Sequence, residues 1–210
     1  MTFVDLTQPV ESGMPVYPGD PEVLAGLVLT AVKDGANVAR LHLGSQSGTH
    51  VDAPFHIDDA LPRLSDLPLE RFAGRAVIMD ATDVPDREIG PELLPDGLRA
   101  GDVLLVRTGW SAYWGSPEYW TTHPYLAIRT ASAIVAAGVR TVGIDAASVD
   151  PPDSLAAHAV LLGASAVICE NLTSLEQVTG PAEVMLFPLR LAGLDMGDGA
   201  PVRAVARLTA

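Results

Sequence analysis

The sequence is short of several features that would set a protein's class. It holds one cysteine, Cys169, among 210 residues, which excludes an intrachain disulfide and favours a reducing compartment. Basic residues are scarce, with 13 Lys and Arg against 26 Asp and Glu and a formal net charge of -13. This balance opposes binding to nucleic acid, which needs a basic footprint, and binding to an anionic membrane surface.

Long apolar runs are missing as well. No stretch of the sequence approaches the roughly 20 apolar residues that cross a bilayer. Residues 1–7 have neither the basic start nor the apolar run of a secretory signal. We therefore expect a soluble, cytoplasmic protein. Hydrophobic residues make up 48% and charged residues 19%, and no repeat or linker divides the chain, so residues 1–210 are expected to form a single domain.

The most informative segment, residues 46–56, reads Gln-Ser-Gly-Thr-His-Val-Asp-Ala-Pro-Phe-His. If residues 46–52 are extended, then Gln46, His50 and Asp52 share one face of a strand. Pro54 should end that strand and leave His56 on the following loop. Imidazole and carboxylate on one strand face form half of a metal site, whereas the alternative is a hydrogen-bonded core pair without a metal.

Apolar runs and helix signals predict the remaining elements. Strands are expected at residues 38–43, 76–80, 103–107, 141–145, 166–170, 183–191 and 202–208, the last two joined by a turn at 195–199. Helices are expected at residues 125–137, ended by Gly138, and at residues 153–162, capped by Asp153 or Ser154. Strands that alternate with helices in the second half predict an α/β fold with a mixed β-sheet core flanked by helices.

Two residues of the second half could complete a metal site. His158 lies within the second predicted helix, and Glu170 ends an apolar strand, where an unpaired buried charge would be costly. Each has a simpler interpretation, because His158 could be a packing or surface residue and Glu170 could emerge into solvent. Cys169 should face away from Glu170 as a buried structural thiol. His123 is expected on a surface loop.

Residues 47–56 resemble the signature of the cyclase-like metal-dependent hydrolases, which include kynurenine formamidase (arylformamidase) and isatin hydrolase. The family pattern runs His-x-Gly-Thr-His-x-Asp-x-Pro-x-His. Residues 15–20, 106–110, 153–158 and 170–172 resemble further segments of the family, so the similarity spans most of the chain. The resemblance implies a swivelling α/β fold and assembly as a homodimer or homotetramer.

The resemblance also implies roles for single residues. By this match His50 and Asp52 bind a divalent metal, with Asp52 able to bridge two ions. His158 would serve a second ion, and Glu170 would complete or bridge the centre. His56 matches the catalytic histidine of the family, expected to act as general base and then as general acid.

Two positions qualify the match. Tyr17 stands where members of the family often carry an aromatic residue near the substrate. Gln46 stands where the signature has its first histidine. Three outcomes are open for Gln46: it coordinates through its oxygen, it hydrogen-bonds a metal-bound water, or one metal position is weak or empty. An oxygen donor suits Mn(II) as well as Zn(II), so both ions are candidates, as one ion or two.

The implied activity is hydrolysis of an amide or ester bond in a small molecule, most directly N-formylkynurenine to kynurenine and formate. Three alternatives are open. The chain could hydrolyse a cyclic amide or lactone, it could be a metal-dependent lyase or cyclase, or it could be a non-catalytic metal-binding module.

Overall fold

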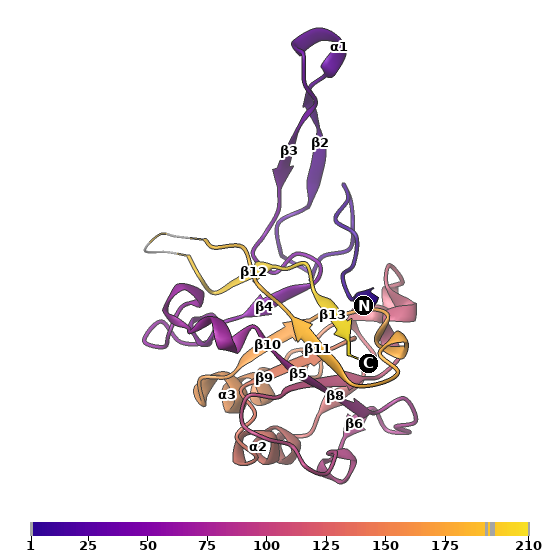
Figure 1. Cartoon of the computed structure of the whole chain (residues 1–210), viewed down its shortest axis with the longest axis vertical. Coiled ribbons are helices and arrows are strands. Elements are labelled where there is room, and N and C mark those ends of the chain that lie inside the picture. Colours follow the sequence, from indigo (N-terminus) through magenta and orange to yellow (C-terminus); the bar gives the residue numbers. More distant parts are fainter. Residues whose placement is uncertain (1, 192, 194–195, 210) are drawn as a thin grey trace.

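The apolar runs of the sequence meet in one nine-stranded sheet (Figure 1). The structure is a computed structural model that describes residues 2–191, 193 and 196–209. At the centre lie four parallel strands: β5 (Ala73–Asp80), β7 (Val103–Arg107), β9 (Thr141–Ile144) and β10 (Val167–Glu170). Antiparallel strands extend both sides: β11 (Ala182–Met185), β13 (Val205–Leu208) and β1 (Thr2–Asp5) beyond β5, and β4 (His50–Asp52) and β12 (Gly199–Pro201) beyond β10.

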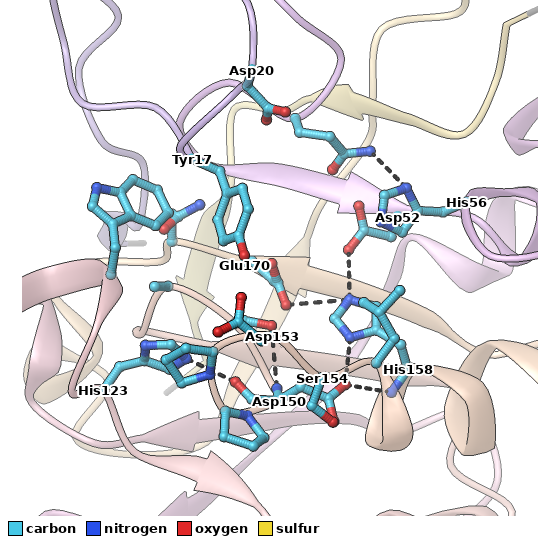
Figure 2. Close-up of a pocket in the computed structure, with 18 of the residues that line it drawn as sticks. Tyr17, Asp20, Asp52, His56, His123, Asp150, Asp153, Ser154, His158 and Glu170 are labelled. Carbon is cyan, nitrogen blue, oxygen red and sulfur yellow. Dashed lines mark hydrogen bonds and ion pairs between the residues drawn. The ribbon is translucent and has the colours of Figure 1, made fainter.

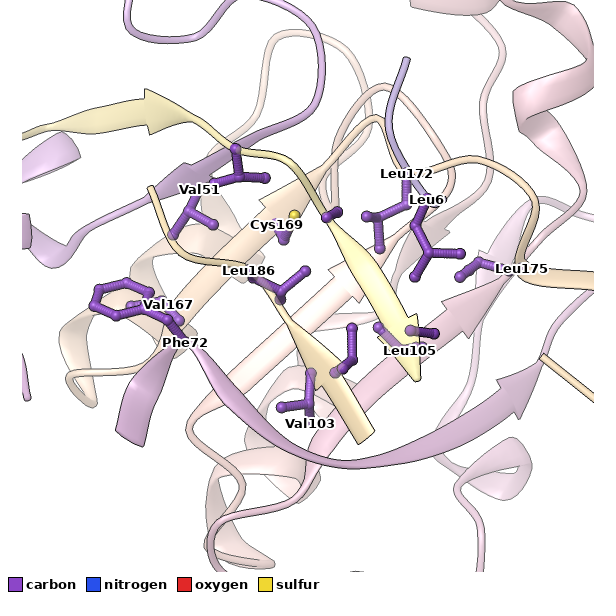
Figure 3. Packing of buried hydrophobic residues seen from close by; sticks show 14 of the residues in the cluster. Leu6, Val51, Phe72, Val103, Leu105, Val167, Cys169, Leu172, Leu175 and Leu186 are labelled. Atoms are coloured by element: carbon purple, nitrogen blue, oxygen red, sulfur yellow. The ribbon is translucent and has the colours of Figure 1, made fainter. Parts of the chain in front are cut away.

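The central strands separate two apolar cores. Leu104 and Val106 belong to the core under the helices α2 (Ile128–Ala136) and α3 (Ala156–Gly163). Val103 and Leu105 alternate with them and face the opposite core, as period-two strands require. That second core (Figure 3) takes residues from both ends of the sheet, among them Leu6, Val51, Val167, Cys169, Leu172, Val184, Ala200 and Ala206. The sheet is therefore curled, so that its two ends share one core.

A hairpin stands apart from this sheet. Strands β2 (Leu24–Leu29) and β3 (Val38–His42) pair with each other and project far from the body, with the short helix α1 (Ala31–Asp34) at the tip (Figure 1). We call residues 24–42 the arm. Its side chains are mostly exposed, Leu27 to 60% and Leu41 to 61%. The strand predicted at residues 38–43 is thus confirmed, but it forms part of the arm and not of the main sheet.

A short pair of parallel strands explains why the helix predicted at residues 125–137 begins only at Ile128. Residues Tyr125–Leu126 form strand β8, which pairs with β6 (Glu88–Ile89), and the N–H of Leu126 also donates to the carbonyl of Val149 at 2.9 Å. These tertiary hydrogen bonds outweigh helix propensity, so α2 begins only at Ile128. Gly138 follows that helix with a φ of +82°, as predicted.

The C-terminal strands also differ from expectation. The strand predicted at 183–191 ends at Met185, and Pro188, which has no N–H to offer a ladder, makes only an isolated bridge to Val202. The next strand begins at Val205 and not at residue 202. Residues Gly199–Pro201 pair with β4 as β12, so that Gly199, the last residue of the predicted turn, begins a strand. Asp195 of that turn lies outside the described residues.

Short 3₁₀ turns connect several elements, at Pro54–His56, Leu64–Asp66, Leu69–Arg71, Pro91–Leu93, Trp110–Tyr113, Pro117–Trp120 and Leu175–Gln177. Within the described part of the chain, no helix has the length and apolar character that a membrane span requires.

Candidate metal centre

Four acidic and imidazole side chains converge where β4, β10 and α3 meet, and Figure 2 shows three of them, Asp52, His158 and Glu170. The antiparallel register sets His50 directly opposite Glu170. Nε2 of His50 lies 3.4 Å from Oδ1 of Asp52 and 3.8 Å from Oε2 of Glu170. From α3, Nε2 of His158 lies 3.6 Å from Oδ2 of Asp52 and 3.5 Å from Oε1 of Glu170. The four residues that the sequence could not prove to meet are therefore brought together.

The donor set fits a divalent cation. Both carboxylate oxygens of Asp52 are buried without a hydrogen-bond partner, which is costly unless a nearby positive charge compensates. Ligand atoms from His50, Asp52 and Glu170 all lie within 4.8 Å of one another. Two ligand atoms at tetrahedral positions about 2.1 Å from one Zn(II) would lie roughly 3.4 Å apart, close to the His50–Asp52 distance of 3.4 Å.

Charge pairing shifts the acid–base behaviour of these groups. Burial by itself lowers the pKa of His50 and His158, but the neighbouring carboxylates outweigh it and raise the pKa to about 9 for His50 and about 10 for His158. Burial raises the pKa of Asp52, yet the facing imidazoles hold it well below its usual range. Since a metal needs neutral imidazole ligands, protons compete with the ion, and metal affinity increases with pH toward these values.

Asp150 holds the His158 ring by its Nδ1 atom, on the side away from the centre. This role was not predicted from the sequence. Oδ2 of Asp150 accepts the ring Nδ1–H of His158 at 2.7 Å and the backbone N–H of His158 at 2.8 Å, while Oδ1 accepts the N–H of Ala157 at 2.6 Å. The carboxylate thereby caps α3, the role predicted for Asp153 or Ser154, and the hydroxyl of Ser154 also accepts the N–H of Ala156 at 3.3 Å. Asp153 instead has a φ of +63° and lines the cavity (Figure 2). Because Asp150 holds Nδ1, it leaves Nε2 of His158 for the centre.

Replacing Asp150 with asparagine is expected to weaken metal binding about 10- to 100-fold, because the ligand imidazole loses the carboxylate that orients it and raises its basicity. The asparagine oxygen can still cap α3, so the fold should persist. Competition with a chromogenic chelator measures the affinity. Asp153→Asn is the matched control and should bind the metal as the native protein does. An Asp150→Asn protein with native affinity would contradict the supporting role.

Gly48 determines how the segment before β4 runs. Only residues 50–52 are strand, because Gly48 has a φ of +64° and residues 45–49 form a turn. The prediction that residues 46–52 are extended is therefore wrong. The carbonyl of Gly48 accepts Nδ1–H of His50 at 2.8 Å, which turns Nε2 of that ring toward the carboxylates. Gln46 lies in the turn, where its Nε2 is 3.0 Å from Oδ2 of Asp198.

His56 follows β4 in the 3₁₀ turn Pro54–His56, as the proline predicted. Its ring centroid is 5.9 Å from that of His158. Both rings line a cavity of about 570 Å³, together with Gln46. Tyr17, predicted to lie near the substrate, lines the same cavity, and its ring meets that of Trp120 edge to face at 5.9 Å.

Two further residues test the sequence predictions. His123 was expected on the surface but is only 2% exposed, because its Nε2–H donates to the carbonyl of Asp150 at 2.8 Å and holds the ring against the cavity wall. Cys169 is fully buried on the opposite side of β10 from Glu170, and burial raises its pKa well above the ordinary value. It is a structural thiol, as predicted.

Comparison with known proteins bears on the whole chain. Residues 4–151 match the model of the Cyclase family. The kynurenine formamidase of Bacillus cereus is 34% identical over 209 residues, which cover 98% of this chain and 97% of the relative. An isatin hydrolase bound to the product analogue thioisatinate is similar in fold, with a TM-score of 0.86 at 20% identity over 97% of this chain and 91% of that one.

A third similar structure is named a potential metal-dependent hydrolase with cyclase activity. It is 27% identical, with a TM-score of 0.79 over 98% of this chain and 96% of that one. The family model, the relative at 34% identity and the shared α/β fold agree, and the chain therefore belongs to the Cyclase family.

Proposed function

We propose that the chain is a metal-dependent hydrolase of a small-molecule amide or ester bond, with N-formylkynurenine as the first candidate substrate. The convergence of His50, Asp52, His158 and Glu170 around the unpaired oxygens of Asp52 carries this proposal. Similarity to kynurenine formamidase along nearly the full chain supports the choice of substrate.

The four residues would hold Zn(II) or Mn(II), as one ion or two. When bound, a divalent ion lowers the pKa of a water ligand toward neutrality and polarises the carbonyl under attack. The cavity would seat the substrate beside this centre, with Tyr17 and Trp120 available to pack against a planar ring. His56 faces the same space, either to accept the proton of the attacking water or to donate a hydrogen bond to the carbonyl oxygen.

Metal restoration tests the activity. Purified protein stripped of metal should not hydrolyse N-formylkynurenine, and adding back Zn(II) or Mn(II) should restore a kcat/KM on the order of 10⁴ M⁻¹s⁻¹ or more. Formate and kynurenine are measured together, so that hydrolysis is distinguished from other loss of substrate. Absence of turnover with both ions would exclude this substrate.

The charge of the cavity favours a second candidate, a cyclic amide or lactone. Among the described residues that line the cavity there is no lysine or arginine, whereas Asp20 and Asp153 are present. The α-carboxylate of N-formylkynurenine would therefore meet no lysine or arginine among these described lining residues, whereas an uncharged ring needs no such partner. The ratio of kcat/KM for N-formylkynurenine and isatin, measured on one metal-loaded preparation, separates the two candidates. A product that has gained the elements of water indicates hydrolysis, because lyase or cyclase chemistry does not add water across a bond.

We also propose that the arm packs against a second copy of the chain in a cytoplasmic homodimer or homotetramer. A lone two-stranded hairpin is marginally stable in water, and Leu27 and Leu41 lie exposed on one of its faces. The arm also joins the loop that carries Asp20 to the turn that carries Gln46, so its packing would steady one side of the cavity.

Charges on the arm should dissociate this assembly. The double substitution Leu27→Asp and Leu41→Asp is expected to give a monomer by multi-angle light scattering, because it sets two carboxylates in the apolar contact. Val32→Asp, at the exposed tip, is the control. A native protein that is already monomeric at micromolar concentration would contradict the proposal.

A further inference from the structure

We propose that Asp198 and Gln46 are positioning residues that present a hydrogen-bond donor to Nδ1 of His56 and leave the ring proton on Nε2, so that His56 serves the reaction as a hydrogen-bond donor. This inference deepens the proposed function and rests on it for the role of His56. It assigns His56 the role of hydrogen-bond donor and not that of general base. It also gives Gln46 a role other than metal coordination, a hydrogen bond to metal-bound water, or a weak or empty metal position.

Asp198 fixes which end of the Gln46 amide faces it. Oδ2 of Asp198 lies 3.0 Å from Nε2 of Gln46 and also accepts the hydroxyl of Ser45 at 2.6 Å. A carboxylate oxygen only accepts hydrogen bonds. If the amide were turned over, its oxygen would face the carboxylate oxygen at the same short distance and no bond could form. The amide nitrogen therefore occupies this place.

The same nitrogen faces His56. Nε2 of Gln46 lies 3.4 Å from Nδ1 of His56, a long contact that Figure 2 draws as a dashed line. One amide hydrogen is directed to Asp198, and the other is left for the ring. A donor that faces Nδ1 needs a lone pair there, so the neutral ring carries its proton on Nε2. A proton on Nδ1 would set N–H against N–H.

The backbone around this pair is shaped to hold it. A Cβ atom on Gly199 would lie 2.5 Å from Nε2 of Gln46 and 2.9 Å from the backbone oxygen of Val51, so glycine at this position leaves room for the amide. Gly199 pairs with Asp52 across β12 and β4. The carbonyl of Asp198 accepts the N–H of Ala53 at 2.8 Å, which ties the loop to the segment that leads into His56. Asp198 and Gly199 are thus tied to β4, the strand that carries His50 and Asp52, and to Ala53, which follows it.

An Nε2–H group on this ring has a defined chemical use. Water first gives one proton to solvent and the resulting hydroxide adds to the carbonyl carbon of a bound amide or ester; when the adduct later collapses, the leaving nitrogen or oxygen takes up the hydroxyl proton. As the new C–O bond forms in the addition, the C=O π bond breaks and its electron pair moves to the carbonyl oxygen. A fixed donor aimed at that oxygen stabilises the developing charge. No bond to His56 forms or breaks in this step, and the imidazole keeps its proton. His56 then acts as an oxyanion-stabilising donor and not as a general base.

Side-chain ¹⁵N NMR on histidine-labelled, Zn(II)-loaded protein tests the inference. The sequence has five histidines, so assignment by single substitutions is practical. Native His56 is expected as the Nε2–H tautomer. Gln46→Glu presents only acceptor oxygens and should move the proton to Nδ1. Asp198→Asn frees the Gln46 amide to turn and should give a mixture. Both variants should lose turnover mainly in kcat, by about 10²-fold.

Asp20→Asn is the matched control, because Asp20 lines the same cavity without a bond to Gln46 or His56 in the described contacts. It should keep the native tautomer, which shows that the hydrogen bond and not the nearby charge sets it. A proton on Nδ1 in the native protein, or an unchanged tautomer in Gln46→Glu, would overturn the inference. The tautomer is measured without substrate, so a failure of the proposed hydrolysis is recognised separately.

Discussion

Protein with Asp52→Asn is expected to lose its metal and its turnover together. Asp52 contributes one oxygen toward His50 and the other toward His158, and neither oxygen has a hydrogen-bond donor. Asparagine keeps the shape of the Asp52 side chain, but it removes the negative charge and replaces one acceptor oxygen by an NH2 group, which donates hydrogen bonds. Breaking a buried charge set in this way costs about 3–5 kcal/mol, which corresponds to a metal affinity on the order of 10²- to 10³-fold lower.

The experiment is a metal titration followed by a rate measurement. Metal content after desalting is determined by mass spectrometry, and the rate is measured with excess ion added, so that lost binding and lost catalysis are separated. Asp20→Asn removes a carboxylate of the same cavity and should retain native metal content. Full metal occupancy and full activity in Asp52→Asn would show that the reacting centre lies elsewhere.

The strand pair that carries this centre could be predicted, because its information is local. A period of two sets His50 and Asp52 on one face of β4, and an apolar run that ends in Glu170 marks a buried strand with a costly terminal charge. The sequence could not show that β4 pairs with β10 in the register that joins His50 to Glu170. That pairing depends on contacts between residues more than a hundred positions apart.

The supporting residues could not be predicted, because each depends on a tertiary contact. Asp150 caps α3 from outside the helix, eight residues before His158, whereas cap signals favoured the nearer Asp153 or Ser154. Gln46 would share a face with His50 and Asp52 if residues 46–52 were extended, but the left-handed turn at Gly48 moves it toward Asp198. Tertiary hydrogen bonds of this kind leave no periodic pattern in the sequence. They nevertheless determine how the predicted ligands are oriented.

Replacing His56 with alanine is expected to leave metal content unchanged and to lower kcat by about 10²- to 10³-fold. The ring lies beside His158 and Gln46, and among the described residues the ion pairs that join imidazoles to Asp52 and Glu170 come from His50 and His158 and not from His56. Its loss therefore removes a group that acts on the reacting carbonyl and leaves the centre that binds the ion. His42→Ala, on the exposed arm, is the control and should show native values for both quantities.

His56→Gln then separates the two chemistries that the ring could perform. A glutamine can present an amide N–H where Nε2–H of the imidazole stood, but it cannot exchange a proton near neutral pH. If His56 is a hydrogen-bond donor to the developing oxyanion, His56→Gln should recover about tenfold of the kcat that His56→Ala loses, since one hydrogen bond contributes roughly 1.4 kcal/mol. If His56 is the general base, the two variants should be equally slow. Equal and full activity in both variants would remove His56 from the reaction altogether.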